Sequence, residues 1–238
     1  MIKTFTFILI SVTFVFLFDS INFAAAFEKK SQPNNPPSVK IISPKNNTVF
    51  STGTPIHYSI TVSDKEDGDS KYDEINPKEV LLQVKLLNDT VNMEMIKNRI
   101  ENDSPGLMAL RISNCFNCHS FDSKLIGPSF EEINKRYKPT AENIALLSKR
   151  IREGSSGVWG KVSMPTHPEL SDSQTQNMIK WIMQNASSSN VHYYIGIEGS
   201  LTLKAQKTYL LTASYTDHGI NNSGQRLKGQ DVIVIFSR

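Results

Sequence analysis

The chain has 238 residues, which is enough for one large domain or two small ones. Hydrophobic residues make up 39% and charged residues 21%, as in ordinary globular proteins. The net charge is only +3 and no run of basic residues occurs, which argues against a nucleic-acid binder that follows phosphates. The two cysteines, Cys115 and Cys118, are too few for a disulfide-stapled scaffold or a four-cysteine zinc or iron–sulfur site.

Residues 1–26 have the pattern of a secretory signal peptide. Lys3 supplies the positive start, residues 5–18 are mostly apolar, and three alanines at 24–26 offer a cleavage site. A transmembrane anchor would need about 18 or more apolar residues, whereas Asp19 ends this run early. We therefore expect an exported bacterial protein, periplasmic or beyond, without a stable membrane span.

Strand patterns occupy both ends of the remaining chain. A Pro-rich linker is expected at residues 27–37, followed by a first β region at 38–100 and a second at 189–238. The predicted strands are residues 39–42, 56–62, 80–86, 209–215 and 232–236. The strands of either region alone are too few to bury a core, but together they approach the roughly seven of an immunoglobulin-like sandwich.

Residues 101–188 between these regions have helical spacing. Capping boxes at Ser129 with Glu132 and at Ser171 with Gln174 mark two helix starts, and a third apolar stripe ends before Gly154. Two arrangements fit this order: unrelated β pieces that flank a helical domain, or one β-sandwich with the helical domain inserted. We favour the insertion, hence a multidomain α + β fold.

One short motif indicates a specific chemical role. Residues 115–119 read Cys-Phe-Asn-Cys-His, the pattern of c-type haem attachment, in which two thiols bind the two vinyl groups of one porphyrin and the adjacent histidine is an axial ligand. A redox disulfide between Cys115 and Cys118 is the alternative, but it leaves His119 without a role and lacks the βαβ context it requires. A zinc site is weaker, because no further ligands complete it.

The sixth iron ligand is expected from a loop between two predicted helices. Met164 lies there, 45 residues after His119, and a thioether ligand raises the reduction potential of the iron. His167 is a competing ligand only three residues further on, and spacing alone does not separate the two.

Residues 115–185 resemble the small single-haem class I cytochromes c of bacteria. The resemblance covers about a third of the chain and includes the haem motif, the Gly-Pro turn at 127–128, the stretch at 150–160 and Met164-Pro165. It implies one covalent haem c, with His119 and Met164 as axial ligands.

The same resemblance implies roles for three further residues. The Pro128 carbonyl would accept the ring N–H of His119, and Arg150 and Trp159 would hydrogen-bond a haem propionate. The alternative for Arg150 is a solvated helix face, and for Trp159 it is core packing.

The β regions resemble bacterial immunoglobulin-like or PKD-like modules. The whole arrangement is similar to the cytochrome-bearing end of exported proteins that carry a quinoprotein sugar-dehydrogenase-like domain. No such catalytic domain is present here, so a link to sugar oxidation is an analogy about a partner. One haem with both axial positions filled has no open position for a substrate, so we expect an electron carrier rather than an enzyme. Its partners would be redox proteins, with a quinoprotein sugar dehydrogenase or a terminal oxidase as candidates.

Two other functions stay open at this point. A haem-based sensor would need a displaceable or absent Met164, and a carbohydrate-binding or adhesion module would use Tyr193, Tyr194 and Tyr215 as stacking faces. Separately, four carboxylates in residues 64–69 could bind calcium, although a solvated turn is the commoner explanation of such a loop.

Overall fold

The computed structural model describes residues 33–87, 101–220 and 224–238. The predicted signal peptide at 1–26 and the first part of the predicted linker lie outside the described residues. None of the described helices is both long and apolar enough to cross a membrane.

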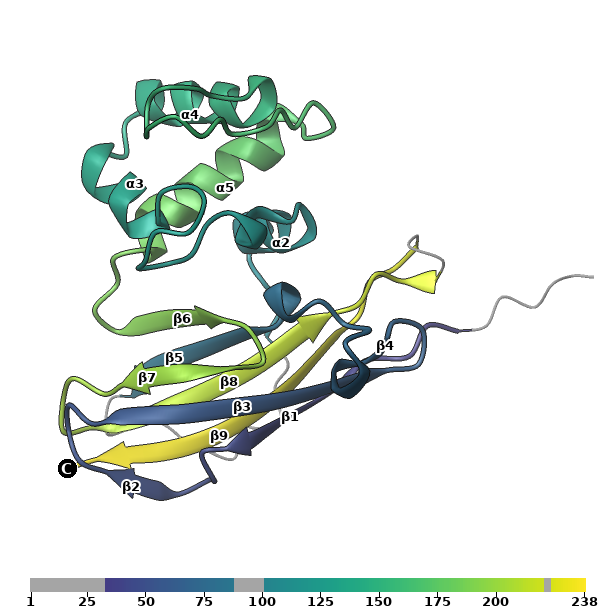
Figure 1. The fold of residues 1–238 in the computed structure, drawn as a ribbon, viewed down its shortest axis with the longest axis vertical. Coiled ribbons are helices and arrows are strands. Elements are labelled where there is room, and N and C mark those ends of the chain that lie inside the picture. The colour runs from purple at the N-terminus through teal and green to yellow at the C-terminus, as the bar shows by residue number, and fades with distance from the viewer. Residues whose placement is uncertain (1–32, 88–100, 221–223) are drawn as a thin grey trace, which may run out of the picture. The chain divides into compact units, whose positions relative to one another are not determined.

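Strands that precede and follow the helices in sequence combine into two sheets (Figure 1). The first sheet contains β1 (Ser38–Ser43), β3 (Pro55–Asp64), β4 (Gly68–Asp69) and β7 (Glu198–Thr202), with β7 paired to β3. The second has the order β2 (Thr48–Phe50), β9 (Lys228–Ser237), β8 (Thr208–Thr216), β5 (Leu81–Leu87) and β6 (Val191–Ile195). The five predicted strands are confirmed, and β2, β4, β6 and β7 were not predicted.

One hydrophobic core joins the two sheets. In β3, buried and exposed residues alternate, so that Tyr58, Ile60 and Val62 point into this core. The opposite face of the core is supplied by β5, β8 and β9, with Leu211 and Ile235 fully buried. Because both sheets contain strands from both β regions, the alternative of two unrelated β pieces is wrong. The immunoglobulin-like assignment stays a prediction.

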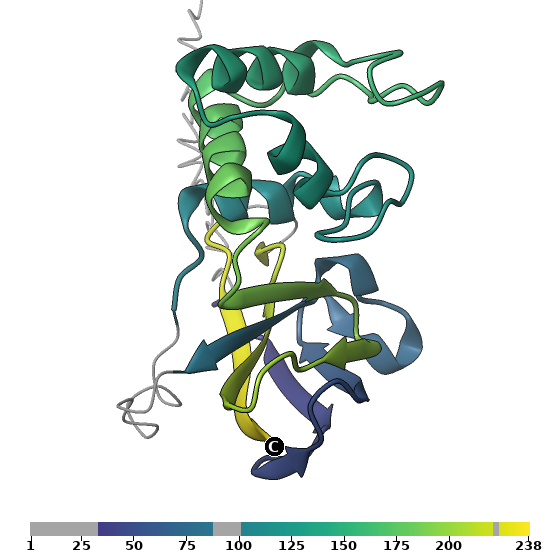
Figure 2. The ribbon, with the colours of Figure 1, turned by 90° about the vertical axis from the view of Figure 1, so that its left-hand side faces the viewer.

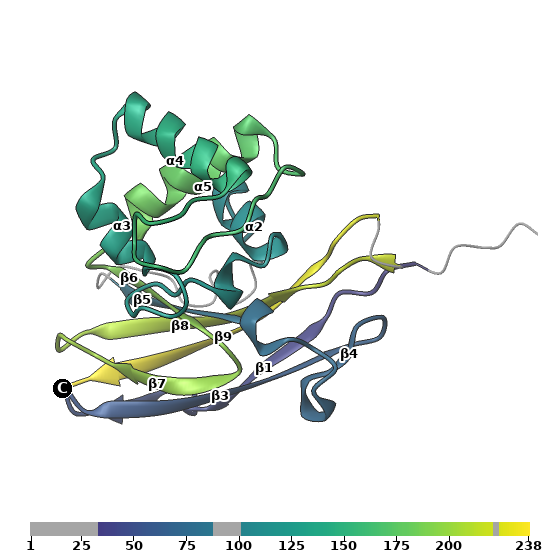
Figure 3. The same cartoon turned by 45° about the horizontal axis from the view of Figure 1, so that its top comes forward.

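The helices lie between β5 and β6 in the chain, although these two strands pair antiparallel over Leu81↔Ile195 to Lys85↔Val191. They are α2 (Pro105–Ile112), α3 (Phe130–Arg136), α4 (Ala141–Glu153) and α5 (Asp172–Asn185). Figures 2 and 3 show them gathered beside the β5–β6 edge of the strands. The helical segment is thus inserted into a sheet.

Local sequence signals account for where the helices start. Both predicted capping boxes are confirmed: Ser129 and Glu132 exchange hydrogen bonds at the start of α3, and Ser171 and Gln174 do so at α5. The stripe of apolar residues on α4 ends at Gly154, which has a φ of 81°.

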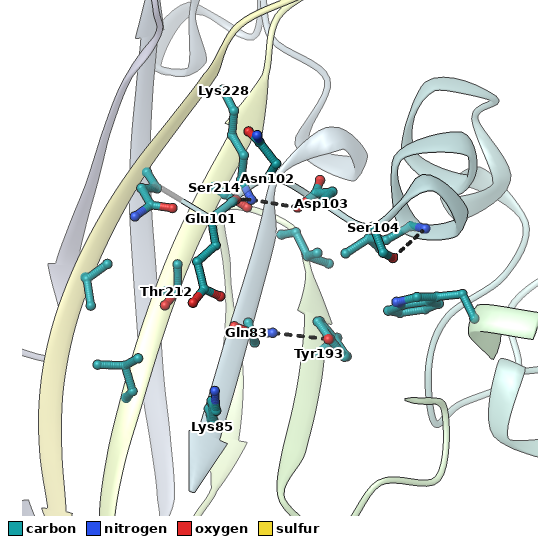
Figure 4. A pocket seen from close by; sticks show the side chains of 16 residues that line it. Gln83, Lys85, Glu101, Asn102, Asp103, Ser104, Tyr193, Thr212, Ser214 and Lys228 are labelled. Atoms are coloured by element: carbon teal, nitrogen blue, oxygen red, sulfur yellow. Dashed lines mark hydrogen bonds and ion pairs between the residues drawn. The ribbon is translucent and has the colours of Figure 1, made fainter. Parts of the chain in front are cut away.

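Arg111 connects the helical segment to the second sheet from a fully buried position. Its guanidinium donates to the side chain and the carbonyl of Ser214 on β8, to the carbonyl of Glu79, and to Asp103 at 2.9 Å. Asp103 also pairs with Lys228 of β9 at 2.6 Å (Figure 4). Since a buried guanidinium must satisfy its donors, these acceptors orient α2 against the sheet.

Removal of Asp103 should therefore destabilise the fold strongly. Burial already lowers the pKa of Arg111, and Asp103→Ala removes the carboxylate that opposes this shift. We expect a loss of about 3–5 kcal/mol in the free energy of unfolding, measured by chemical denaturation. The control is Glu131→Ala, which breaks an exposed pair with Lys135 and should cost at most about 1 kcal/mol. Equal costs for the two variants would contradict a structural role for the buried pair.

Helices α2 and α5 approach closely at Gly106. A Cβ atom at this position would lie 2.3 Å from the Asn177 carbonyl oxygen and 2.6 Å from Trp181 Cβ. Only glycine, which has no side chain, fits this crossing without moving one helix.

We therefore expect Gly106→Ala to destabilise the protein by about 1–3 kcal/mol, although alanine is the better helix former. Thermal unfolding measures the effect, and Gly106→Val should cost more than Gly106→Ala. The exposed Gln184→Ala on α5 should change stability by at most about 0.5 kcal/mol. A higher melting temperature for Gly106→Ala would show that the crossing has room for a methyl group.

Candidate functional site

An apolar cavity in the helical segment brings together the seven residues for which the sequence predicted a role at the haem. Its walls are mostly aliphatic and aromatic side chains from α2 to α5 and from the loops between them. The predicted site residues that line it are Cys115, Cys118, His119, Pro128, Arg150, Trp159 and Met164. They come from three separate stretches of the chain, so the fold collects them. An apolar cavity with a few convergent polar groups is the usual form of a cofactor site.

The two cysteines flank a single turn of 3₁₀ helix, Cys115–Asn117. The N–H groups of Cys118 and His119 both donate to the Cys115 carbonyl, at 3.2 and 3.0 Å, and this places His119 directly after the turn. Both thiols are free, and burial raises the pKa of Cys115 to about 12. Redox-active cysteines have lowered pKa values, so this environment does not favour the redox-disulfide alternative.

His119 is buried with one ring nitrogen engaged. Its Nδ1 lies 2.7 Å from the Pro128 carbonyl oxygen, and its ring stacks on Phe130 at 5.6 Å. A carbonyl can only accept, so Nδ1 carries the proton and Nε2 keeps its lone pair. Burial lowers the pKa of His119, which favours the neutral ring. A neutral imidazole with a free Nε2 and an oriented ring is a suitable iron ligand.

Met164 is held in the cavity wall by backbone pairing. Its N–H donates to the Ser155 carbonyl at 2.8 Å, and the Ser155 N–H donates back to the Met164 carbonyl at 3.2 Å. His167, the competing ligand, does not line the cavity, and its Nδ1 lies 3.0 Å from Glu169 Oε1. The structure therefore places Met164, and not His167, in the wall of the cavity that His119 also lines.

Arg150 and Trp159 lie at the same cavity, each with a further contact. The Arg150 guanidinium donates to the Tyr137 hydroxyl at 2.7 Å. The Arg136 guanidinium lies 4.5 Å from the centre of the Trp159 ring and donates to the Val158 carbonyl. Sequence reasoning missed Arg136, because α3 and the Trp159 loop are separated in the chain and only their packing pairs them.

The tyrosines that could have stacked on a sugar are engaged elsewhere. Tyr215 is fully buried, Tyr194 packs edge-on against Tyr58, and Tyr193 stacks on Phe121 at 5.0 Å. These contacts use the three rings in packing within the protein rather than as a glycan-binding face.

A second cavity, of about 270 Å³, is polar and lies between the second sheet and the start of the helical segment (Figure 4). Gln83 and Tyr193 both line this cavity, and the Gln83 side-chain amide donates to the Tyr193 hydroxyl at 3.1 Å. None of the seven predicted haem-site residues lines it, whereas Tyr193 does.

The comparisons with known proteins match the part of the chain that contains this cavity. The cytochrome c family model matches residues 109–186. Cytochrome c2 of Rubrivivax gelatinosus is 42% identical over 74 residues, which is 30% of this chain and 87% of that protein. Cytochrome c-551 of Azotobacter vinelandii is 36% identical over 73 residues, 31% of this chain and 88% of that protein.

A solved structure gives a similar match. The crystal structure of wild-type Nitrosomonas europaea cytochrome c552 is 31% identical, covers 33% of this chain and 96% of its own, and has a TM-score of 0.32. On the sequence matches, the chain contains a class I cytochrome c domain related to small bacterial cytochromes c. The chain belongs to the cytochrome c family, whose members bind haem c covalently, and its one cytochrome domain corresponds to one haem. The matched residues 109–186 contain none of the strands.

Gly127 allows the His119 ring to occupy its position. A Cβ at residue 127 would lie 2.5 Å from His119 Cε1, and the ring is held on its other sides by Pro128 and Phe130. Gly127→Ala should displace the ring and destabilise the protein by about 1–3 kcal/mol. NMR signals of the His119 ring and thermal unfolding measure the two effects. The neighbouring Leu125→Ala, 41% exposed and outside the cavity, is the control. Unchanged His119 signals in Gly127→Ala would contradict this packing.

Proposed function

We propose that the chain is an exported mono-haem c-type cytochrome that carries single electrons between redox proteins. In this proposal Cys115 and Cys118 attach the haem, and His119 and Met164 are its axial ligands. The observation that carries it is the convergence of these four residues on one apolar cavity, with the Nε2 lone pair of His119 free. The residues present therefore fit the cofactor.

When bound, haem c supplies an iron that exchanges one electron between its ferrous and ferric forms. The chain's own residues determine the position of the cofactor and how readily it exchanges the electron. Pro128 fixes the ring proton of His119 on Nδ1, and Ser155 holds the Met164 backbone, so that neither ligand has to be reorganised. The apolar wall excludes water, and a thioether ligand favours the ferrous state.

Arg150 and Trp159 contribute the polar side of the cavity. In this proposal they hydrogen-bond a propionate, with Tyr137 orienting Arg150 and Arg136 holding the Trp159 ring. A cationic and N–H-donating environment suits a carboxylate that must lie beside apolar walls.

If His119 and Met164 both bound the iron, they would leave no coordination position for a substrate or a gas. This favours a carrier over a haem-based sensor. Partner contacts of electron carriers are small and transient, and the partners proposed here are redox proteins, with a sugar dehydrogenase of the quinoprotein type or a terminal oxidase as candidates. The proposed location is the periplasm or another exported compartment.

The test is an absorption spectrum of the exported, purified protein in its oxidised and reduced forms. We expect a covalent c-type spectrum with the far-red sulfur-to-iron band, and loss of that band in Met164→Ala. Met108→Ala removes another half-buried methionine outside the cavity and should keep the band, as should His167→Ala.

Carbon monoxide separates the carrier from the sensor. The reduced parent protein should not bind it, whereas reduced Met164→Ala should, because the substitution opens a coordination position. Rapid binding by the parent would favour the sensor, and absence of haem from protein made with the haem-maturation machinery would reject the cytochrome proposal.

A further inference from the structure

A cluster of oxygen-bearing side chains lies far from the haem cavity in sequence, at one end of the strands. Three segments meet there: residues 33–37 before β1, the turn between β3 and β4, and the loop after β8. Asn34 Nδ2 donates to Asp217 Oδ2 at 2.9 Å, and Asn35 Nδ2 donates to Glu66 Oε1 at 3.1 Å. The Glu66 N–H donates to Asp64 Oδ1 at 2.9 Å. The charge of Asp217 also acts on Asp64, so Asn34, Asp64, Glu66 and Asp217 are neighbours.

Three buried oxygens of this cluster have no hydrogen-bond donor among the residues that the structure describes. They are Asn34 Oδ1, Asp64 Oδ2 and Glu66 Oε2. The Asn34 amide orientation is determined, because its Nδ2 faces two groups that can only accept, the Asp217 carboxylate and the Gln225 carbonyl. Unpartnered buried oxygens are costly, and one on a carboxylate is more costly still.

The buried carboxylate of Asp64 is the group in this cluster that a nearby positive charge would stabilise most. Asp64 is only 6% exposed. Burial raises the pKa of its carboxyl group, and the charges of Asp67 and Asp217 raise this pKa further. Asp217 is completely buried, and its carboxylate accepts from the neutral N–H groups of Gly219, Leu227 and Asn34. Within the described residues, no Lys, Arg or His forms an ion pair with Asp64 or Asp217.

The other carboxylates of the acidic loop already have partners. Asp67 accepts from the Tyr215 hydroxyl at 2.7 Å and pairs with His218 at 3.1 Å. Asp69 accepts from the Lys71 N–H and caps the 3₁₀ turn that follows. Asp64 and Glu66 differ from them, because each also has a buried second oxygen without a donor among the described residues.

We propose that Asp64, Glu66 and Asn34 bind one Ca²⁺ ion. Carboxylate and amide oxygens are the ligands that calcium prefers, and calcium accepts six to eight oxygens in flexible geometry, so carbonyls and water can complete the set. Among the described residues, no three Asp, Glu, His or Cys side chains already form a metal-binding group. The proposed set differs from such a group, because it combines two carboxylates with an amide.

Binding would join the segment before β1 to the β3–β4 turn and offset the charge of Asp64 and Asp217. The site uses none of the residues of the haem cavity, so it does not depend on the proposed function. It is a property of the strands, which the family match does not cover.

The test uses the full haem-containing protein, treated with a chelator and then titrated with CaCl₂ by calorimetry. We expect one ion per chain, and a melting temperature that rises with free calcium because the ion binds the folded state. Asp64→Asn should abolish both the binding heat and the rise. Its amide oxygen can still accept from the Glu66 and Asp67 N–H groups, so the turn should form. With chelator present, this variant should be at least as heat-stable as the parent.

The matched control is Asp73→Asn, which makes the same charge change at an exposed residue of the same region and should bind calcium like the parent. Glu66→Gln is the second test variant and should lose binding as well. The proposal is overturned if the parent gives no binding heat up to about 1 mM free calcium, the weak end for extracellular modules. It is also overturned if Asp64→Asn binds as tightly as Asp73→Asn, or if MgCl₂ gives the same response as CaCl₂.

Discussion

The pairing of β5 with β6 is the constraint on which the rest of the molecule depends. These strands are adjacent in the second sheet although the whole helical segment separates them in the chain. The two ends of that segment are therefore fixed side by side, and α2 and α5, its first and last helices within the described residues, must come together. They do so at Gly106, where α2 and α5 are close enough to exclude a methyl group. The same constraint places Arg111 against β8, where its donors find acceptors on the sheet.

The cavity is a consequence of how little the short helices can bury against one another. Helices α3 and α4 and the loops around them surround an apolar space, and the two sheets have a separate core of their own. A covalently held, largely apolar cofactor supplies the missing buried surface, which a small helical unit otherwise lacks. The polar atoms at the cavity are few and each is oriented by a neighbour: His119 by Pro128, Arg150 by Tyr137, and Trp159 by Arg136. Such pre-orientation suits a protein that must change its charge by one electron without changing its structure.

The calcium site proposed at one end of the strands uses none of the residues that line this cavity. The two sheets bury a continuous apolar core, yet at one end carboxylate and amide oxygens are buried without a donor from the part of the chain that the structure describes. A bound ion is one explanation of buried polar groups that lack a hydrogen-bond partner in a native fold. The molecule therefore combines a domain with a recognisable cofactor motif and a β region whose own site emerges only from contacts between distant segments.

Several features could be predicted from short sequence patterns, whose residues lie close to one another in the chain. The Cys-x-x-Cys-His motif, the two capping boxes and the period-two strands depend on neighbours along the chain, so the sequence alone determined them. The short strands β2, β4, β6 and β7 escaped prediction, because their pairing partners rather than their own composition make them strands. Met164 and His167 are equivalent by spacing, and only the Ser155 pairing and the cavity wall distinguish their positions. Likewise, Arg136 under Trp159 and Asn34 beside Asp217 are contacts across many residues of chain. The tertiary structure alone decided them, because side chains distant in sequence meet only when packing brings their backbones together.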